Sequence, residues 1–144
     1  MLKPLLWVGL ALTLTACAPE PTDLLTDYMT SLQAGDNSKA RKLSCVPNQF
    51  QSVQPNTISD WQILMQLPKR YNGINYTQAI VRVDMPDGIG TATLTWELWI
   101  WKPGDAYKHY QSTHQNQPEA EDGLPTLTKA DWSTQPRCIS HQHE

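Results

Sequence analysis

Several motifs that would identify an enzyme are missing from this sequence. It has no glycine-rich phosphate loop, no nucleophile elbow and no paired metal ligands at the usual spacing. No internal repeat is present, and no cluster of basic residues suggests nucleic acid as a partner. The apolar run Leu5–Leu14 is too short to span a bilayer core, which needs roughly 20 residues. These absences make an enzyme less expected and predict no cofactor and no metal ion.

The start of the chain has the features of a bacterial secretory signal. Lys3 precedes the apolar run, and small residues follow it before a break. The tetrapeptide Leu14-Thr15-Ala16-Cys17 resembles the lipobox of bacterial lipoproteins. The resemblance implies that residues 1–16 are removed as a signal peptide and that Cys17 then carries acyl chains such as palmitate. Two or more such chains anchor a protein stably, whereas one anchors it only marginally.

An ordinary secretory signal is the alternative for this segment. Ala16-Cys17-Ala18 fits the small-x-small rule, but Pro19 would then follow the cleaved bond, where its fixed φ and tertiary nitrogen are unfavourable. No aspartate follows Cys17, and by resemblance to Gram-negative sorting rules this favours the outer membrane, facing the periplasm. In a Gram-positive bacterium the protein would stay on its single membrane.

Removal of the signal peptide leaves 128 residues, which is enough for one domain. We expect a lipidated tether over residues 17–21, a single α+β domain over 22–140 and a tail over 141–144. Because Lys3 is lost, ten basic and fourteen acidic residues remain, a net charge of −4. That acidity is typical of a soluble, exposed domain.

The other two cysteines, Cys45 and Cys138, form an even pair in an oxidising compartment, which predicts a disulfide. It would close a loop of about 93 residues and contribute about 4 kcal/mol by the loop-entropy relation. Two free buried thiols are the alternative.

Helical periodicity marks residues 22–34, where apolar residues recur every four positions: Leu24, Tyr28 and Leu32. Thr22 can cap the start of this helix, and Gly35 can end it. A second, short helix is expected to begin at Asp36 or Ser38.

From Asp60 the period changes to two, which predicts strands. The first strand is expected to end at Pro68 and to carry one apolar face: Trp61, Ile63, Met65 and Leu67. A turn over 69–73 contains Asn72-Gly73 and leads to a second strand with its own apolar face: Ala79, Val81, Val83 and Met85.

The turn Pro86-Asp87-Gly88 leads to the clearest strand of the sequence, whose apolar face is Ala92, Leu94, Trp96, Leu98 and Ile100. A fourth strand is expected over 106–113. Residues 114–125 are polar and read as a loop. Residues 127–139 then add a last strand or edge segment, held by Cys138.

The order of these elements resembles a known family. A helix, the turn Ala34-Gly35-Asp36, a short helix with Lys39-Ala40 and then bent antiparallel strands resemble the cone fold of nuclear transport factor two and ketosteroid isomerase. The resemblance implies an α+β fold, with N-terminal helices packed on a curved antiparallel sheet of about four strands and a pocket at the wide end. The loop 114–125 stands where the family often has a third helix. No family catalytic residue matches a position here, so the family's activity is not carried over.

Trp99 and Trp101 lie on the face of the third strand opposite Trp96, which is expected in the core. Aromatic side chains on an outer face need cover. That cover could be the chain's own C-terminal segment, a dimer partner or a flat ligand such as a sugar ring.

A second candidate group consists of Arg82, Asp84 and His109, with Glu97 and Tyr107 nearby in the pattern. An aspartate and a histidine suffice for acid–base chemistry if a pocket brings them together. The simpler interpretation is that the charges pair across strands on a solvated face. His141 and His143 are expected in a solvated tail, too mobile for a metal site.

Three hypotheses about function follow. The first is a non-enzymatic binding or accessory lipoprotein of the cell envelope, with an envelope protein or a second copy as its partner. The second is a small-molecule isomerase or dehydratase that uses a pocket in the cone. The third is a purely structural envelope factor.

Overall fold

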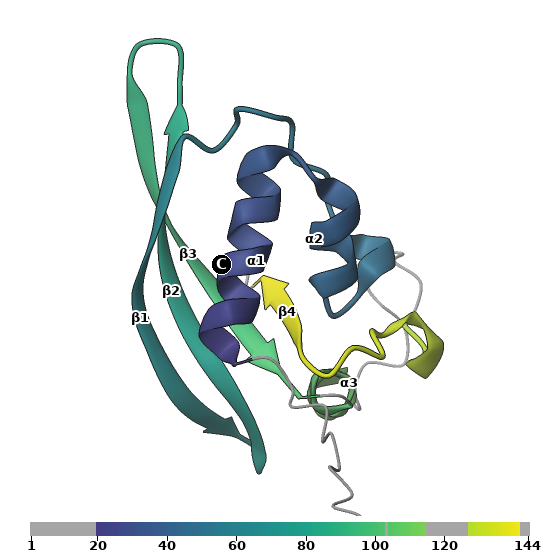
Figure 1. Ribbon diagram of the computed structural model, residues 1–144. Helices are drawn as coiled ribbons and strands as arrows, with labels where there is room; N and C mark the ends of the chain where they lie inside the picture. Colours follow the sequence, from purple (N-terminus) through teal and green to yellow (C-terminus); the bar gives the residue numbers. More distant parts are fainter. Residues whose placement is uncertain (1–19, 103, 115–126, 142–144) are drawn as a thin grey trace, which may run out of the picture.

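The computed structural model describes residues 20–102, 104–114 and 127–141. The elements in chain order are α1 (Pro21–Ala34), α2 (Asn37–Leu43), β1 (Asp60–Tyr71), β2 (Ile74–Pro86), β3 (Thr91–Trp101), α3 (Asp105–His114) and β4 (Cys138–His141). The strands form one curved, unclosed antiparallel sheet in the order β1-β2-β3-β4. The helices α1 and α2 lie on its concave side (Figure 1). The predicted α+β fold class is therefore confirmed.

Helix α1 begins at Pro21, one residue before the predicted cap Thr22. Proline suits a first helical turn because the N–H that it lacks would have no partner there. At the other end Gly35 has φ 73° and donates back to the last turn, as predicted. A side chain at position 35 would also meet Pro55 at 2.8 Å, so two constraints require glycine. Asp36 then caps α2 by accepting from the Lys39 N–H at 3.1 Å.

The main core lies between α1 and the concave face of the sheet. Its fully buried members come from α1 and α2, from the three C-terminal strands and from the loop before β1: Leu25, Tyr28, Met29, Leu32, Ala40, Ile58, Ala79, Val81, Val83, Leu98, Ile100 and Ile139. Trp96 packs against this core and is partly buried, on the predicted face. Apolar burial of this kind contributes roughly 25 cal/mol per Å², so α1 is fixed to the sheet mainly by this stripe.

The single apolar face predicted for β1 is wrong beyond Ile63. The register with β2 shifts between Ile63 and Met65, a β-bulge in which β1 has one extra residue. Trp61 and Ile63 therefore face the core, whereas Met65 and Leu67 turn to the opposite face and are 42% and 38% exposed. One extra residue exchanges the two faces of everything that follows, because side chains alternate with a period of two.

The predicted end of β1 at Pro68 is also wrong, since the strand continues to Tyr71. Pro68 pairs with Thr77, and proline is tolerated here because β1 is an edge strand. The turn is therefore confined to Asn72 and Gly73, both with positive φ (49° and 79°), the backbone of a tight hairpin.

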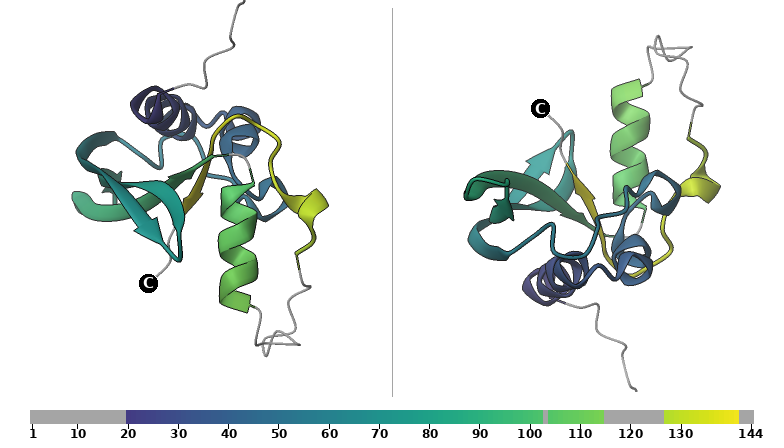
Figure 2. Two further views of the ribbon diagram at one scale, coloured as in Figure 1. Left: turned by 90° about the horizontal axis from the view of Figure 1, so that it is seen from below. Right: turned by 90° about the horizontal axis from the view of Figure 1, so that it is seen from above.

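The largest correction concerns residues 105–114, which form the helix α3 and not a fourth strand. Asp105 stands in its first turn and pairs with Lys108 at 3.8 Å. The aromatic residues of this segment fit both the helical and the strand period. The helix is favoured because it packs on the convex face of the sheet. Figure 2 shows α1 and α3 on opposite sides of the sheet.

The fourth strand is β4, which pairs with the end of β3. Of the segment predicted over 127–139, only Cys138 and Ile139 belong to this strand. His141, which we expected in the tail, is its last residue. His114, the first residue of the predicted loop 114–125, belongs to α3, and the rest of that loop and His143 lie outside the described part. On its other side β4 bonds to the end of α2, where Cys45 donates to the Ile139 carbonyl at 2.9 Å.

Candidate functional site

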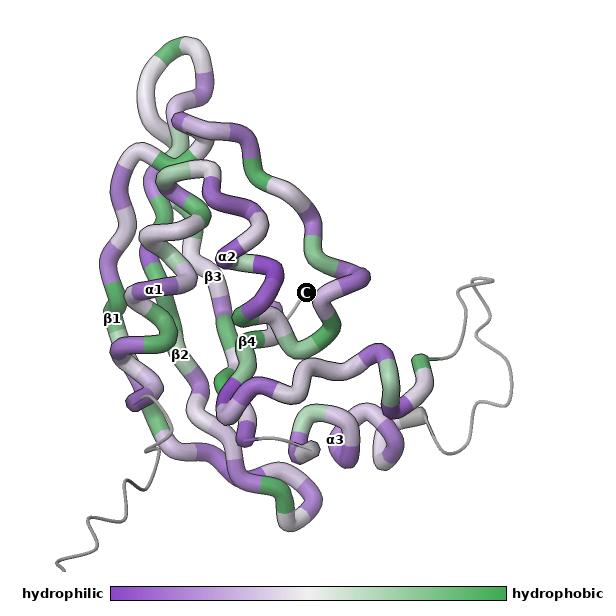
Figure 3. Tube along the Cα trace, turned by 45° about the vertical axis from the view of Figure 1, so that its right-hand side comes forward, coloured by the Kyte–Doolittle hydropathy of each residue, from purple (hydrophilic) through white to green (hydrophobic). Residues whose placement is uncertain are grey.

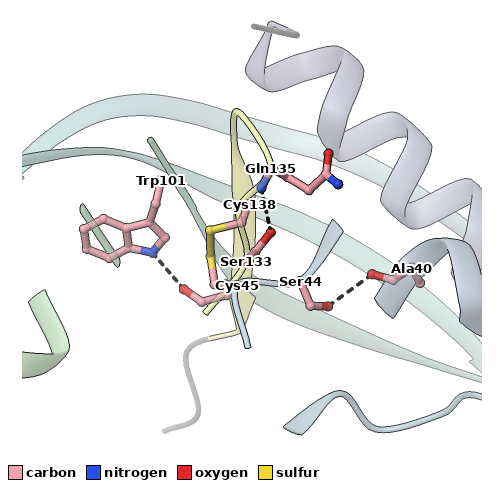
Figure 4. The surroundings of a disulfide bond; sticks show 8 residues. Ala40, Ser44, Cys45, Trp101, Ser133, Gln135 and Cys138 are labelled. Atoms are coloured by element: carbon pink, nitrogen blue, oxygen red, sulfur yellow. Dashed lines mark hydrogen bonds between the residues drawn. A yellow bond between two sulfur atoms is a disulfide. The ribbon is translucent and has the colours of Figure 1, made fainter. Parts of the chain in front are cut away.

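The predicted disulfide is present and joins Cys45 to Cys138 across 93 residues. Both cysteines are buried, at 1% and 5% exposure, and their Cα atoms are 4.8 Å apart. Figure 4 shows the bond beside Trp101, at the junction of α2 with β4. The bridge therefore fixes the C-terminal strand to the N-terminal half of the fold. Cys17, the predicted lipidation site, lies outside the described residues.

Five rings gather on the convex face, and we call them the aromatic cluster: Tyr71, Tyr76, Trp99, Trp101 and His109. Tyr76 stacks on Trp99 with ring centroids 4.4 Å apart, and His109 stacks on Trp101 at 5.0 Å. Tyr71 meets the edge of His109 at 5.2 Å. The first four rings come from the sheet, and His109 comes from α3.

The chain itself covers the Trp101 end of this cluster. Trp101 is 1% exposed and donates from Nε1 to Ser140 Oγ at 2.9 Å. Ala106 of α3 is packed in the same buried group. The ring of Trp132 contacts the rings of Tyr107 and Tyr110 on α3. Trp99 remains half-buried, and its Nε1 donates to the Glu97 carboxylate at 2.6 Å. The C-terminal segment, one of the covers considered, contacts Trp101 through Cys138 and Ser140. The rest of the cover is α3, which was not among those considered.

Arg82 and Asp84 do not share a site with His109. Arg82 pairs with Asp60 at 3.1 Å and with Asp84 at 3.6 Å, in a polar row on the convex face. That row lies opposite Thr95, whereas His109 contacts Trp101, six residues along β3. Six residues of strand span about 20 Å, so the two groups are too far apart for one acid–base pair. The geometry agrees with the simpler interpretation, in which the charges pair across strands, since Arg82 of β2 pairs with Asp60 of β1.

Glu97 and Tyr107 are also in separate places. The Glu97 carboxylate accepts from Gln78 Nε2 at 2.7 Å as well as from Trp99, within the sheet. Tyr107 lies on α3 with its ring 5.8 Å from that of Trp132. The predicted pocket residues are therefore divided among the polar row, the middle of the sheet and α3.

A polar pair that the sequence analysis missed lies on the concave face. The Tyr28 hydroxyl and His141 Nε2 form a hydrogen bond of 2.9 Å, whose donor depends on the tautomer of the imidazole. Trp96 meets the His141 ring edge-on at 5.1 Å. The available signal was Tyr28 itself, because a tyrosine within a buried stripe needs a partner for its hydroxyl. No pattern in the sequence identifies His141 as this partner.

Burial raises the pKa of Tyr28 well above its ordinary value of 10.0, and a hydrogen bond with Ser44 offsets this only in part. On the convex face, burial raises the pKa of Tyr76, with a smaller contribution from the nearby Glu97 carboxylate. Both phenols therefore hold their protons more tightly than free tyrosine, which suits hydrogen bonding and opposes action as a base at neutral pH.

Within residues 20–102, 104–114 and 127–141, no three histidine, cysteine, aspartate or glutamate side chains gather as they would around a metal ion. None of the helices in this described part has the length and apolar character needed to cross a membrane. Comparison of the chain with protein-family models, curated proteins and solved structures found no match.

Proposed function

We propose that this protein is a bacterial lipoprotein anchored through acyl chains on Cys17 and exposed on the extracytoplasmic side of a membrane. The observation that carries the proposal is the pairing of the cysteines. Cys45 and Cys138 are bonded to each other in the interior, which leaves Cys17, inside the lipobox-like tetrapeptide, as the cysteine available for lipid. A structural disulfide also fits an oxidising compartment. In a Gram-negative bacterium the location would be the periplasmic face of the outer membrane.

The role that we propose for the domain is that of a non-enzymatic binding or accessory protein of the envelope. Its support comes from the concave side of the sheet, where cone-fold proteins would have a pocket. Here Leu25, Met29 and Leu32 of α1 pack against this side at 0–2% exposure. The candidate acid–base residues Asp84 and His109 are also held apart, as described above.

Mass spectrometry of the purified native protein tests the anchor. We expect a mature chain that begins at Cys17 and carries the added mass of a diacylglyceryl group. An intact Met1, or a chain that begins at Pro19 without lipid mass, would contradict the proposal. In cell fractionation, Cys17→Ser should leave the membrane fraction. The matched control, in which Cys45 and Cys138 are both replaced by alanine, should remain membrane-bound wherever it folds.

A small-molecule enzyme is the second candidate function, and the Tyr28–His141 pair is the observation that favours it. A phenol and an imidazole 2.9 Å apart can exchange a proton with a substrate if the substrate reaches them. Hydrogen–deuterium exchange at the His141 ring carbon, read by peptide mass spectrometry, measures that access. Exchange as fast as in the unfolded chain would support a pocket, whereas strong protection would assign the pair to the core.

A further inference from the structure

Strand β1 exposes a group of large apolar side chains, of which only Tyr71 has a ring contact with another described element, at His109 of α3. Leu64 is 53% exposed, and Met65, Leu67 and Tyr71 are 42%, 38% and 45% exposed. We call these four residues the β1 patch. Figure 3 shows hydrophobic residues midway along β1, at the margin of the molecule. The bulge after Ile63 is the cause, because it turns Met65 and Leu67 away from the core.

The segment of β1 that carries the patch lies beside the first turn of α1, although the patch and the helix are on opposite faces of the sheet: Gln66 points to the concave face, and Met65 and Leu67 point to the convex face. Thr22, the second residue of that helix, accepts a hydrogen bond from Gln66 Nε2 at 3.0 Å. Gln66 stands between Met65 and Leu67 in the strand. In Figure 1, α1 begins at the same end of the molecule as the β1–β2 hairpin, and the β2–β3 hairpin lies at the other end.

The tether between the lipid and this helix is short. Three residues lie between Cys17 and Pro21, and a fully extended chain covers about 14 Å over these four steps. Acyl chains on Cys17 would hold the start of α1 within that distance of the bilayer surface, and the segment of β1 that carries the patch lies beside that start across the sheet. Apolar side chains of a surface-bound protein sink roughly 5–10 Å into the boundary between headgroups and acyl chains. The geometry therefore allows both contacts at once.

The same strand disfavours pairing with a second copy. β1 is the edge of the sheet, but Pro68 removes a backbone donor from that edge, and Lys69 and Arg70 add two exposed charges. Proline and charged residues at an edge are features that oppose edge-to-edge association. The two charges are positive, which matches the anionic headgroups of bacterial phospholipids.

We propose that the β1 patch is a second membrane contact, which rests on the lipid surface and fixes the orientation of the domain. This inference rests on the proposed lipidation of Cys17. One hydrophobic anchor leaves a domain free to rotate about its tether, whereas two contacts present one constant face to the periplasmic or external side. That face includes the β2–β3 hairpin, at the end farthest from the patch.

The test uses the lipidated protein in vesicles of phosphatidylethanolamine and phosphatidylglycerol. Leu67→Cys and Met65→Cys each add one free thiol, because Cys45 and Cys138 are bonded and Cys17 carries lipid. An environment-sensitive fluorophore is attached to that thiol, and a phospholipid with a nitroxide on its acyl chain is added as a quencher. The matched control is Ile89→Cys, which replaces an apolar side chain 99% exposed in the β2–β3 turn.

We expect the fluorophores at positions 67 and 65 to lose most of their emission when the nitroxide lipid is present, and the fluorophore at 89 to keep it. Equal emission at all three positions, while the protein still floats with the vesicles, would overturn the second contact and leave the anchor intact. Fluorophore emission at positions 65 and 67 that falls as the protein-to-lipid ratio rises, and that does not change when the nitroxide lipid is added, would mean that a second copy covers the patch. Protein that does not float with vesicles and lacks lipid mass would refute the anchor and this inference together.

Discussion

At the scale of single residues, the least expected feature is a tyrosine hydroxyl in the core. Tyr28 belongs to the apolar stripe of α1 and is 2% exposed, so its hydroxyl must find a partner inside the protein. His141 supplies it from the far end of the chain. The first helix and the last strand are therefore linked by a polar contact as well as by apolar packing.

Replacing Tyr28 with phenylalanine tests this contact. At pH 7 we expect a loss of about 1 kcal/mol in the free energy of unfolding, because the hydrogen bond between the Tyr28 hydroxyl and His141 is removed. The pH dependence gives a second signature. The raised pKa means that the folded protein keeps the Tyr28 proton at a pH where the unfolded chain has lost it. The contribution of the Tyr28 phenol to the free energy of unfolding is therefore fully present below pH 10. Above that pH it decreases, by up to about 1.4 kcal/mol per pH unit.

Urea unfolding of the wild type and of Tyr28→Phe between pH 8 and pH 11 measures this difference. The two curves should converge as the pH rises above 10.0, the ordinary value for tyrosine, because only the wild type has this phenol to lose. A constant difference over the whole range would show that Tyr28 ionises as easily in the folded protein as in the unfolded chain.

At the scale of elements, the strand expected over 106–113 is wrong because local alternation does not describe what an element packs against. Ala106, His109, Tyr110 and Thr113 follow helical spacing, yet Tyr107 and His109 also alternate as in a strand. The helix is favoured by the convex face around Trp101, because Ala106 and His109, three residues apart, both contact that face. The sequence identified Trp99 and Trp101 as residues in need of cover, but it did not identify α3 as the cover.

A proline inside α3 tests this assignment. Gln111 is exposed on the helix, and Gln111→Pro removes a helical hydrogen bond and clashes with the carbonyl of Tyr107. We expect a loss of about 3 kcal/mol and a red shift of tryptophan emission, because Trp101 becomes accessible to water. The matched control Gln111→Ala keeps a good helix former at the same site and should change stability by less than about 0.5 kcal/mol. Unchanged emission in the proline variant would mean that α3 is not what covers Trp101.

At the scale of the whole molecule, the disulfide connects the two parts of the fold. Cys45 follows α2 and Cys138 begins β4, so the bond holds the last strand against the helical layer. Tyr28 and His141 join the same two regions at a second point. The C-terminal segment is thus fixed at both ends of β4, although that strand has only four residues.

Removal of the disulfide measures its contribution. Replacing Cys45 and Cys138 together with alanine should lower the free energy of unfolding by about 4 kcal/mol, because a loop of 93 residues is no longer closed in the unfolded chain. The wild type in reducing buffer is the matched control and should unfold at a similar urea concentration. A double variant as stable as the oxidised wild type would contradict this role of the bond.

The sequence by itself determined the helices at the start, the disulfide pair, the hairpin turns and the fold class. The helix ends and turns depend on local chemistry, since Gly35 and Gly73 permit positive φ and Asp36 caps a helix. The disulfide joins residues far apart, and it was predicted from the number of cysteines and not from a local pattern. The tertiary structure alone decided the bulge after Ile63, the helical state of 105–114 and the partner of Tyr28. These three features depend on contacts between residues far apart in the chain, and the free energy of such contacts is not encoded in the pattern of any one segment.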